Sequence, residues 1–154
     1  MAFVSDLKHR ALYSVPTDLE KNIADIRILL DGIRLLPIGA AIKKRILVQA
    51  IWEHAYATGN TQQAFLGRYR SEAVVNQVGL EIQRDHIYKK AALIRELLSE
   101  SPNFDEILNR AHCCVVTVHE HRKLGLVDKA IDGWERYRVA GVTVFDMVDR
   151  AKVV

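Results

Sequence analysis

The most constraining feature of the sequence is a run of apolar residues at helical spacing near the N-terminus. Five residues recur at intervals of four, three, four and three positions: Leu19, Ile23, Ile26, Leu30 and Ile33. This spacing places the five side chains on one face of an α-helix, which is typical of a helix that packs on a core. Thr17 and Glu20 form a capping-box pattern that predicts where the helix begins. A second interpretation of the stripe is a helical dimer seam.

The sequence pattern predicts further helices in the remainder of the first eighty residues. A second helix is predicted from about Ile38 to Thr58, with its end marked by Gly59 and Asn60. A short helix over 60–66 and another ending at Gly79 follow. We therefore expect a helical subdomain over residues 1–79.

After Gly79 the pattern changes to short strands that alternate with short helices. The stretch 80–87 alternates apolar and polar residues, which predicts a strand, and Cys113 to Thr117 is rich in β-branched residues. Thr117 with Glu120 forms a further capping box and predicts a helix from about Val118. Further helices are predicted over 88–100, 104–110 and 128–141, and a terminal strand over 141–145. The expected fold is mainly α, with a minor α+β character in a C-terminal subdomain over 80–154, the two halves forming one compact domain.

Length and composition narrow the class of protein. A chain of 154 residues is about one domain long, and no apolar run approaches the ~20 residues of a membrane span. The N-terminus lacks the apolar core of a signal peptide, so we expect a cytoplasmic protein that does not bind membranes. The net charge of +3 permits nucleic-acid binding without requiring it, because the basic residues are spread along the chain.

Two separated segments carry the residue types that phosphodiester cleavage needs. Asp85 and His86 close the strand predicted over 80–87, and His119 and His121 lie on the helix predicted after Thr117. A divalent cation bound by a carboxylate and an imidazole neutralises charge on the phosphate, and a second imidazole activates water. Cleavage by this chemistry requires the two segments to meet in the fold.

These residues resemble the HNH, or His-Me finger, nucleases, whose motif pairs an Asp-His-hydrophobic stretch with a later histidine on a helix. The match covers about residues 80–126, with Asp85-His86-Ile87 as the first part. The resemblance implies that His86 is the general base. It also implies that Asp85 and His121 are metal ligands, with His119 as the alternative to His121.

The resemblance also implies a cofactor and a partner. The cofactor would be a divalent metal ion, Mg²⁺, Mn²⁺ or Zn²⁺, and the partner would be nucleic acid. Four basic residues flank the two segments and would contact phosphates: Lys89, Lys90, Arg122 and Lys123.

Two other interpretations remain open from the sequence. A structural zinc site would draw on His112, Cys113, Cys114, His119 and His121, although adjacent cysteines on a strand point to opposite faces. Alternatively, the chain is a non-enzymatic helical interaction module without a cofactor, such as an inhibitor, immunity or adaptor subunit. A protein partner or a homodimer would then be expected, and the two cysteines would pack as small apolar groups.

Overall fold

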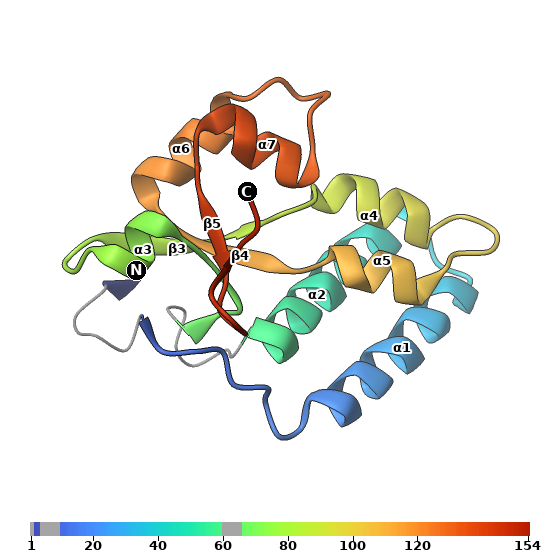
Figure 1. Ribbon diagram of the computed structural model, residues 1–154. Helices are drawn as coiled ribbons and strands as arrows, with labels where there is room; N and C mark the ends of the chain where they lie inside the picture. The colour runs from blue at the N-terminus through green and yellow to red at the C-terminus, as the bar shows by residue number, and fades with distance from the viewer. Residues whose placement is uncertain (1, 4–9, 60–65) are drawn as a thin grey trace.

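A single mixed β-sheet organises the protein. The computed structural model describes residues 2–3, 10–59 and 66–154, and within them six strands pair in the order β1-β3-β4-β2-β5-β6 (Figure 1). The strands are β1 (Ala2–Phe3), β2 (Tyr69–Ser71), β3 (Glu81–His86), β4 (Cys113–Thr117), β5 (Val144–Asp146) and β6 (Ala151–Lys152). The β2–β4 pair is parallel, and the other neighbouring pairs are antiparallel.

The helices gather on the two sides of this sheet. Figure 1 shows α6 and α7 together on one side and α1, α2, α4 and α5 gathered on the other. Their bounds are α1 (Leu19–Leu35), α2 (Ala40–Gly59), α3 (Glu72–Asn76), α4 (Lys90–Leu97), α5 (Phe104–Arg110), α6 (Val118–Leu126) and α7 (Gly133–Ala140). None of the helices in the described ranges is long and apolar enough to cross a membrane.

The strand pair β3–β4 and helix α6 form a continuous ββα unit. The two strands are antiparallel, and their register runs from Ile82 opposite Thr117 to His86 opposite Cys113. Thr117 ends β4 and begins α6, because its side chain accepts from the Glu120 N–H while the Glu120 carboxylate accepts from the Thr117 N–H. The capping box predicted at this point is confirmed, and it fixes how α6 leaves the sheet.

Two apolar cores stabilise the two sides. One lies among α1, α2, α4 and α5, where Leu30, Leu47, Leu93 and Leu97 are fully buried. Each such side chain contributes about 1.5–3 kcal/mol on burial. The other core joins the sheet to α6 and α7 through Cys114, Val116, Leu124 and Tyr137. The ring of Tyr88 packs against both cores and so links the two sides.

The helical stripe of the N-terminal region faces the first core. Ile26, Leu30 and Ile33 are buried, as the core-packing interpretation predicted, so they are not available as a dimer seam. The capping box predicted at Thr17 is wrong, because Asp18 is the N-cap residue and its side chain makes no capping hydrogen bond. The helix nevertheless begins at Leu19, where the apolar stripe begins.

The fold is α+β, and the expectation of a mainly α chain describes it only loosely. The largest difference lies at β2, where the sequence predicted a helix running to Gly79. Residues 69–71 instead form a strand between β4 and β5, and only Glu72–Asn76 are helical. The segment 1–79 thus supplies two strands to the sheet as well as helices. Of the helix predicted over 60–66, residues 60–65 lie outside the described residues.

Candidate functional site

The carboxylate of Asp85 is the centre of the site that the ββα unit builds. It lies at the end of β3, where His121 of α6 and two residues of α7 converge on it. His121 Nδ1 is 3.1 Å from Asp85 Oδ1, and the Tyr137 hydroxyl donates to Oδ2 at 2.5 Å. The Arg136 guanidinium donates to the same Oδ2 and, at 2.7 Å, to the carbonyl oxygen of His86. The end of β3 and the first turns of α6 and α7 therefore meet at Asp85.

Burial makes these contacts energetically important. The Asp85 side chain is 6% exposed and that of Arg136 is 9% exposed, whereas that of His121 is 46% exposed. A carboxylate removed from water is stable only when it is paired and hydrogen-bonded, and Arg136 supplies that pairing. Burial also raises the pKa of Tyr137 well above its ordinary value, so the phenol remains a hydrogen-bond donor. Oδ1 contacts the half-exposed imidazole of His121, whereas Oδ2 contacts the buried side chains of Arg136 and Tyr137.

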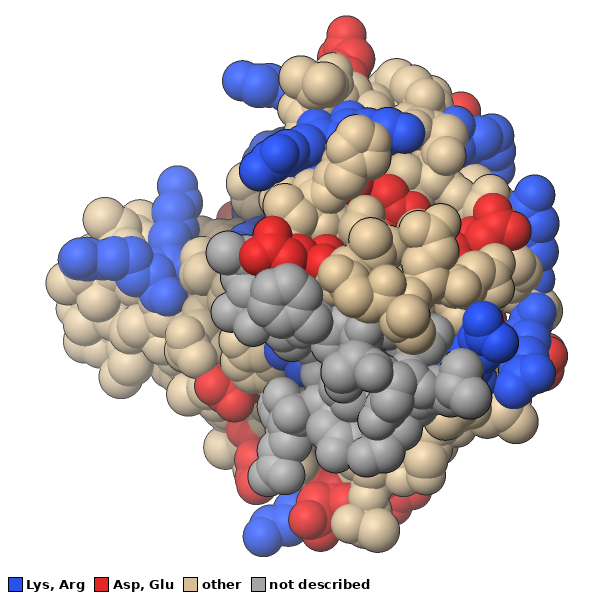
Figure 2. All heavy atoms as spheres, turned by 90° about the vertical axis from the view of Figure 1, so that its left-hand side faces the viewer, with Lys and Arg blue, Asp and Glu red and all other residues tan. Residues whose placement is uncertain are grey.

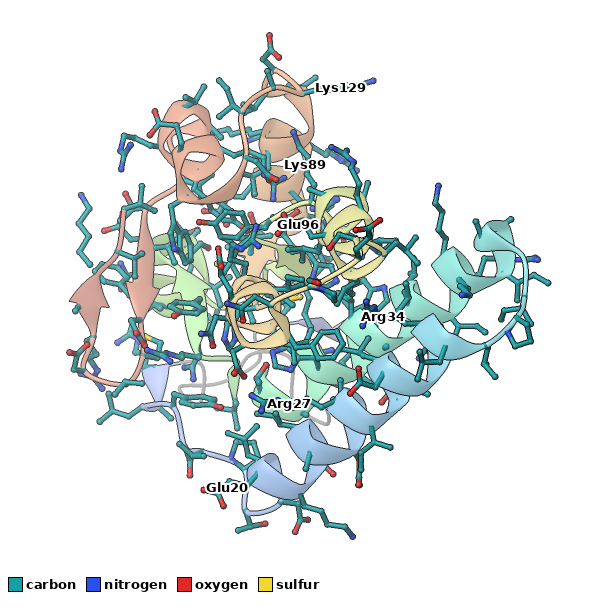
Figure 3. The ribbon with its side chains drawn as sticks, turned by 90° about the vertical axis from the view of Figure 1, so that its right-hand side faces the viewer. Glu20, Arg27, Arg34, Lys89, Glu96 and Lys129 are labelled. Carbon is teal, nitrogen blue, oxygen red and sulfur yellow. The ribbon has the colours of Figure 1, made fainter. Side chains whose placement is uncertain are left out.

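Helix α7 is held in place by the segment that follows β3. The Lys89 N–H donates to both Asp132 carboxylate oxygens, and Lys89 Nζ donates to the Lys129 and Ile131 carbonyls at 2.6 and 2.8 Å (Figure 3). Gly133 has φ +62°, and a Cβ there would lie 2.6 Å from the Tyr88 ring. Glycine is needed at this position for both reasons, and the tight contact sets α7 where Arg136 and Tyr137 reach Asp85.

His86 occupies the opposite face of the same strand. Its Nδ1 lies 3.3 Å from Cys113 Sγ, and its ring centroid lies 4.2 Å from that of Trp52 on α2. Its Nε2 is buried without a hydrogen-bond partner among the described residues. Burial, reinforced by the nearby Lys90 ammonium, lowers the pKa of His86 to about 4. The imidazole is therefore neutral near pH 7.

A shallow hollow of about 320 Å³ connects these groups. Its lining contains the strand end Asp85-His86, the ring of Trp52 and the imidazole of His121. The lining also carries the basic side chains Arg84, Lys89, Lys90 and Arg136. Since the Asp85 carboxylate already pairs with Arg136, the remaining charge of the hollow is positive, which favours an anionic ligand.

The structure separates the predicted residues into two groups. Asp85, His86 and His121 meet at the hollow, and Lys89 and Lys90 line it. Three others line a different hollow between α3 and α6, namely His119, Arg122 and Lys123. His121 rather than His119 is thus the histidine beside Asp85.

The alternative zinc set is spread over both faces of β4. Cys114 packs in the core with α6 and α7, whereas Cys113 contacts His86 on the other face. Burial raises the pKa of the Cys113 thiol to about 12, and both cysteines are free thiols. His112 turns toward His54 of α2, with ring centroids 5.7 Å apart. No group of three or more His, Cys, Asp or Glu side chains within the described ranges is arranged to hold a metal ion.

Sequence reasoning missed three residues of the site: Trp52, Arg136 and Tyr137. Arg136 and Tyr137 lie in the helix predicted over 128–141, but that prediction assigned them no partner outside the helix. A buried arginine next to a buried tyrosine is a signal for a carboxylate partner, but it does not identify Asp85, 51 residues away.

The surface charge agrees with the spread of basic residues along the chain. On the face shown in Figure 2, Lys and Arg side chains stand in separate groups with acidic side chains between them. A broad basic face for duplex binding is not seen on that part of the described surface. Comparisons of the chain with protein-family models, curated proteins and solved structures find no match.

Proposed function

We propose that the protein is a metal-dependent nuclease of the HNH type that acts at the hollow around Asp85. One observation carries the proposal: the Asp85 carboxylate and the His121 imidazole, 36 positions apart in sequence, lie 3.1 Å apart beside His86. The ββα arrangement of β3, β4 and α6 agrees with the resemblance noted in the sequence. Nucleic acid is the proposed partner because the hollow has a positive lining.

The donor atoms suit a hard divalent cation. A carboxylate oxygen and an imidazole nitrogen are ligands for Mg²⁺, Mn²⁺ or Zn²⁺. Mg²⁺ in particular is often held by one or two carboxylates, with water and phosphate oxygens completing its shell. Asp85 Oδ1 and His121 Nδ1 would hold the ion, and the ion would supply charge stabilisation to the phosphate. Arg136 and Tyr137 position the Asp85 carboxylate by holding Oδ2.

His86 is the proposed general base. Its neutral imidazole is the form that accepts a proton, and burial keeps it neutral. Because Nε2 is buried behind the Trp52 ring, this role requires that ring to shift and admit water. Lys90, whose ammonium lies 4.5 Å from the centroid of the same Trp52 ring, is proposed to contact phosphate.

Plasmid nicking in Mn²⁺ or Mg²⁺ tests the proposal. His86→Ala is expected to lower the rate by about 10²–10⁴-fold, the usual contribution of a general base. His121→Ala is expected to raise the Mn²⁺ concentration that gives half the maximal rate by at least about 10-fold. His119→Ala is the matched control, since His119 lies on the same helix but lines the other hollow, and its rate stays unchanged. Nicking that persists in His86→Ala would contradict the proposal.

A second candidate function, a protein-interaction module, is favoured by a separate observation. Apolar side chains are exposed on the second half of α1 and around the turn to α2: Ile28 (71%), Leu35 (82%), Leu36 (46%) and Ile42 (46%). Such a cluster marks an interaction site in many proteins. Light scattering after size exclusion tests it: a dimer or a co-eluting partner that Leu35→Lys disrupts would support it, and a monomer without a partner at high concentration would exclude self-association.

A further inference from the structure

A stacked pair of aromatic rings extends from the candidate site along α2. Trp52 and Tyr56 are one helical turn apart, and their ring centroids are 5.6 Å apart with an interplanar angle of 28°. Both side chains are partly exposed. Because Trp52 also lies against His86, the pair begins at the proposed general base and leads away from it.

A positively charged side chain lies beside each of the two rings. Lys90 Nζ lies 4.5 Å from the Trp52 ring centroid, and Arg84 Cζ lies 5.2 Å from that of Tyr56. Arg84 and Lys90 stand before and after the Asp85-His86 pair, so β3 and the start of α4 carry the charges while α2 carries the rings. Rings flanked by cations are the combination that binds bases by stacking and phosphates by charge.

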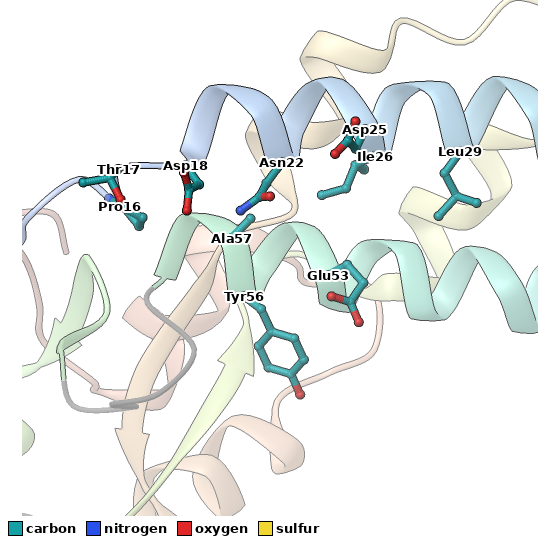
Figure 4. A pocket seen from close by; sticks show the side chains of 10 residues that line it. All are labelled: Pro16, Thr17, Asp18, Asn22, Asp25, Ile26, Leu29, Glu53, Tyr56 and Ala57. Atoms are coloured by element: carbon teal, nitrogen blue, oxygen red, sulfur yellow. The ribbon is translucent and has the colours of Figure 1, made fainter.

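We refer to the rings of Trp52 and Tyr56, with the cations beside them, as the aromatic track. An acidic pocket limits how far the aromatic track extends. It has a volume of about 510 Å³ and lies between α1 and α2, where Asp18, Asp25 and Glu53 line it and Tyr56 stands at its rim (Figure 4). Negative charge there repels a phosphodiester chain. The favourable path therefore runs from His121 past Trp52 and ends at Tyr56.

We infer that the substrate of the proposed site is single-stranded nucleic acid, with two successive bases placed on Trp52 and Tyr56. This inference rests on the proposed function and names its substrate class. A base stacked on Trp52 displaces the Lys90 side chain, whose cation–π contact with an exposed ring is weaker than base stacking. The displaced ammonium then meets the adjacent phosphate.

The choice of single strands follows from which base surfaces are accessible. In a duplex the base faces are stacked on each other and are closed to the rings of α2. In a single strand, or at a frayed end, the faces are open, and stacking on aromatic side chains tolerates any base.

Fluorescence anisotropy without divalent metal tests the inference, using labelled oligothymidylate and an oligo(dA)·oligo(dT) duplex of equal length. The single strand is expected to bind at least about 10-fold more tightly, and Trp52→Ala to weaken it about 10-fold. Lys90→Ala is expected to reduce the slope of log affinity against log salt by about 0.7. Equal affinity for the two forms, or full affinity in Trp52→Ala, would overturn the inference.

The two tryptophans of the sequence provide a readout that does not depend on Trp52→Ala remaining folded. In Trp134→Phe the remaining tryptophan is Trp52, and oligothymidylate is expected to quench its fluorescence. In Trp52→Phe the remaining Trp134 packs against Tyr69 and Tyr137, and its emission is expected to stay unchanged. Absence of quenching in Trp134→Phe overturns the inference.

The cleavage and binding assays distinguish a failure of this inference from a failure of the proposed function. If the protein cleaves duplexes in Mn²⁺ without preferring single strands in the binding assay, the nuclease proposal stands and the substrate inference falls. If oligothymidylate binds through Trp52 but no nucleic acid is cleaved with any divalent metal, the nuclease proposal falls. The aromatic track then remains a single-strand binding site.

Discussion

The two faces of the β3–β4 strand pair give the adjacent residues Asp85 and His86 opposite surroundings. On the α7 side, the buried carboxylate of Asp85 is contacted by His121, Arg136 and Tyr137. On the α2 side, the next residue, His86, lies against Trp52, and burial lowers its pKa to about 4. The Asp85 carboxylate is paired with the Arg136 guanidinium, whereas the His86 imidazole is desolvated and neutral near pH 7.

This contrast explains how one short strand end supplies two chemically different groups. Alternation along a strand sends neighbours to opposite faces, so each meets a different set of helices. For the proposed reaction, the Asp85 carboxylate is held in place to bind a cation. Burial keeps the His86 imidazole unprotonated until water reaches it. Substitutions that remove the partners on one face should therefore leave the other face largely intact.

Removing the arginine from the Asp85 network should have the largest effect. Arg136→Met leaves the buried Asp85 carboxylate without its cation, and breaking a buried ion pair in this way costs about 3–5 kcal/mol of unfolding free energy. Arg138→Met is the matched control, because the Arg138–Glu135 pair is exposed on the same helix. Urea denaturation should show a loss of under about 1 kcal/mol for the control. Equal losses would refute the buried network.

Lowering the pH should test the α2 face. Folded His86 resists protonation down to about pH 4, whereas the unfolded chain takes up the proton near pH 6.5, so its contribution to stability is present above pH 6.5 and is lost as pH falls toward 4. His54 and His112, whose pKa values burial also lowers to about 4, act in the same direction.

His86→Phe isolates the contribution of this residue. The unfolding free energy of the variant should fall by about 2 kcal/mol less than that of the wild type between pH 6 and pH 4.5, because one fewer proton is taken up on unfolding. Urea titrations at the two pH values measure this. Identical pH dependence in both proteins would show that His86 is not held neutral.

Removing one hydroxyl should have a smaller effect on the α7 face. Tyr137→Phe deletes the donor to Asp85 Oδ2 but leaves Arg136 on the same oxygen and His121 on the other. The expected loss is about 1–2 kcal/mol, the cost of one hydrogen bond to a charged group that retains other partners. Thermal unfolding followed by circular dichroism measures it, and a loss as large as that of Arg136→Met would mean that the arginine is not the main partner.

Local signals allowed part of the site to be predicted from the sequence. The β-branched run 113–117 and the Thr117–Glu120 box gave β4 and the start of α6 correctly, and the alternation after Gly79 gave β3. These features depend on residues that are close together in the sequence, so the local sequence pattern predicts them. The meeting of Asp85 with His121 followed only from the resemblance.

The rest of the fold and site depends on distant contacts. β2 has only three residues, and its strand conformation comes from pairing with β4 and β5 rather than from its own sequence. Arg136 and Tyr137 reach Asp85 because Gly133 packs tightly on Tyr88, a contact that helical periodicity does not encode. Trp52 was placed on a helix, but its position over His86 required the packing of α2 on the sheet.

Direct detection of Mn²⁺ binding tests the central claim most directly. His121 is the exposed partner of Asp85, so His121→Ala should change stability by under about 1 kcal/mol while removing one of the two proposed ligands. In electron paramagnetic resonance titrations, the wild type and His119→Ala should bind one Mn²⁺ with similar affinity, and His121→Ala should bind at least about 10-fold more weakly. Equal binding by all three proteins, or no binding by the wild type, would contradict a metal site at Asp85 and His121.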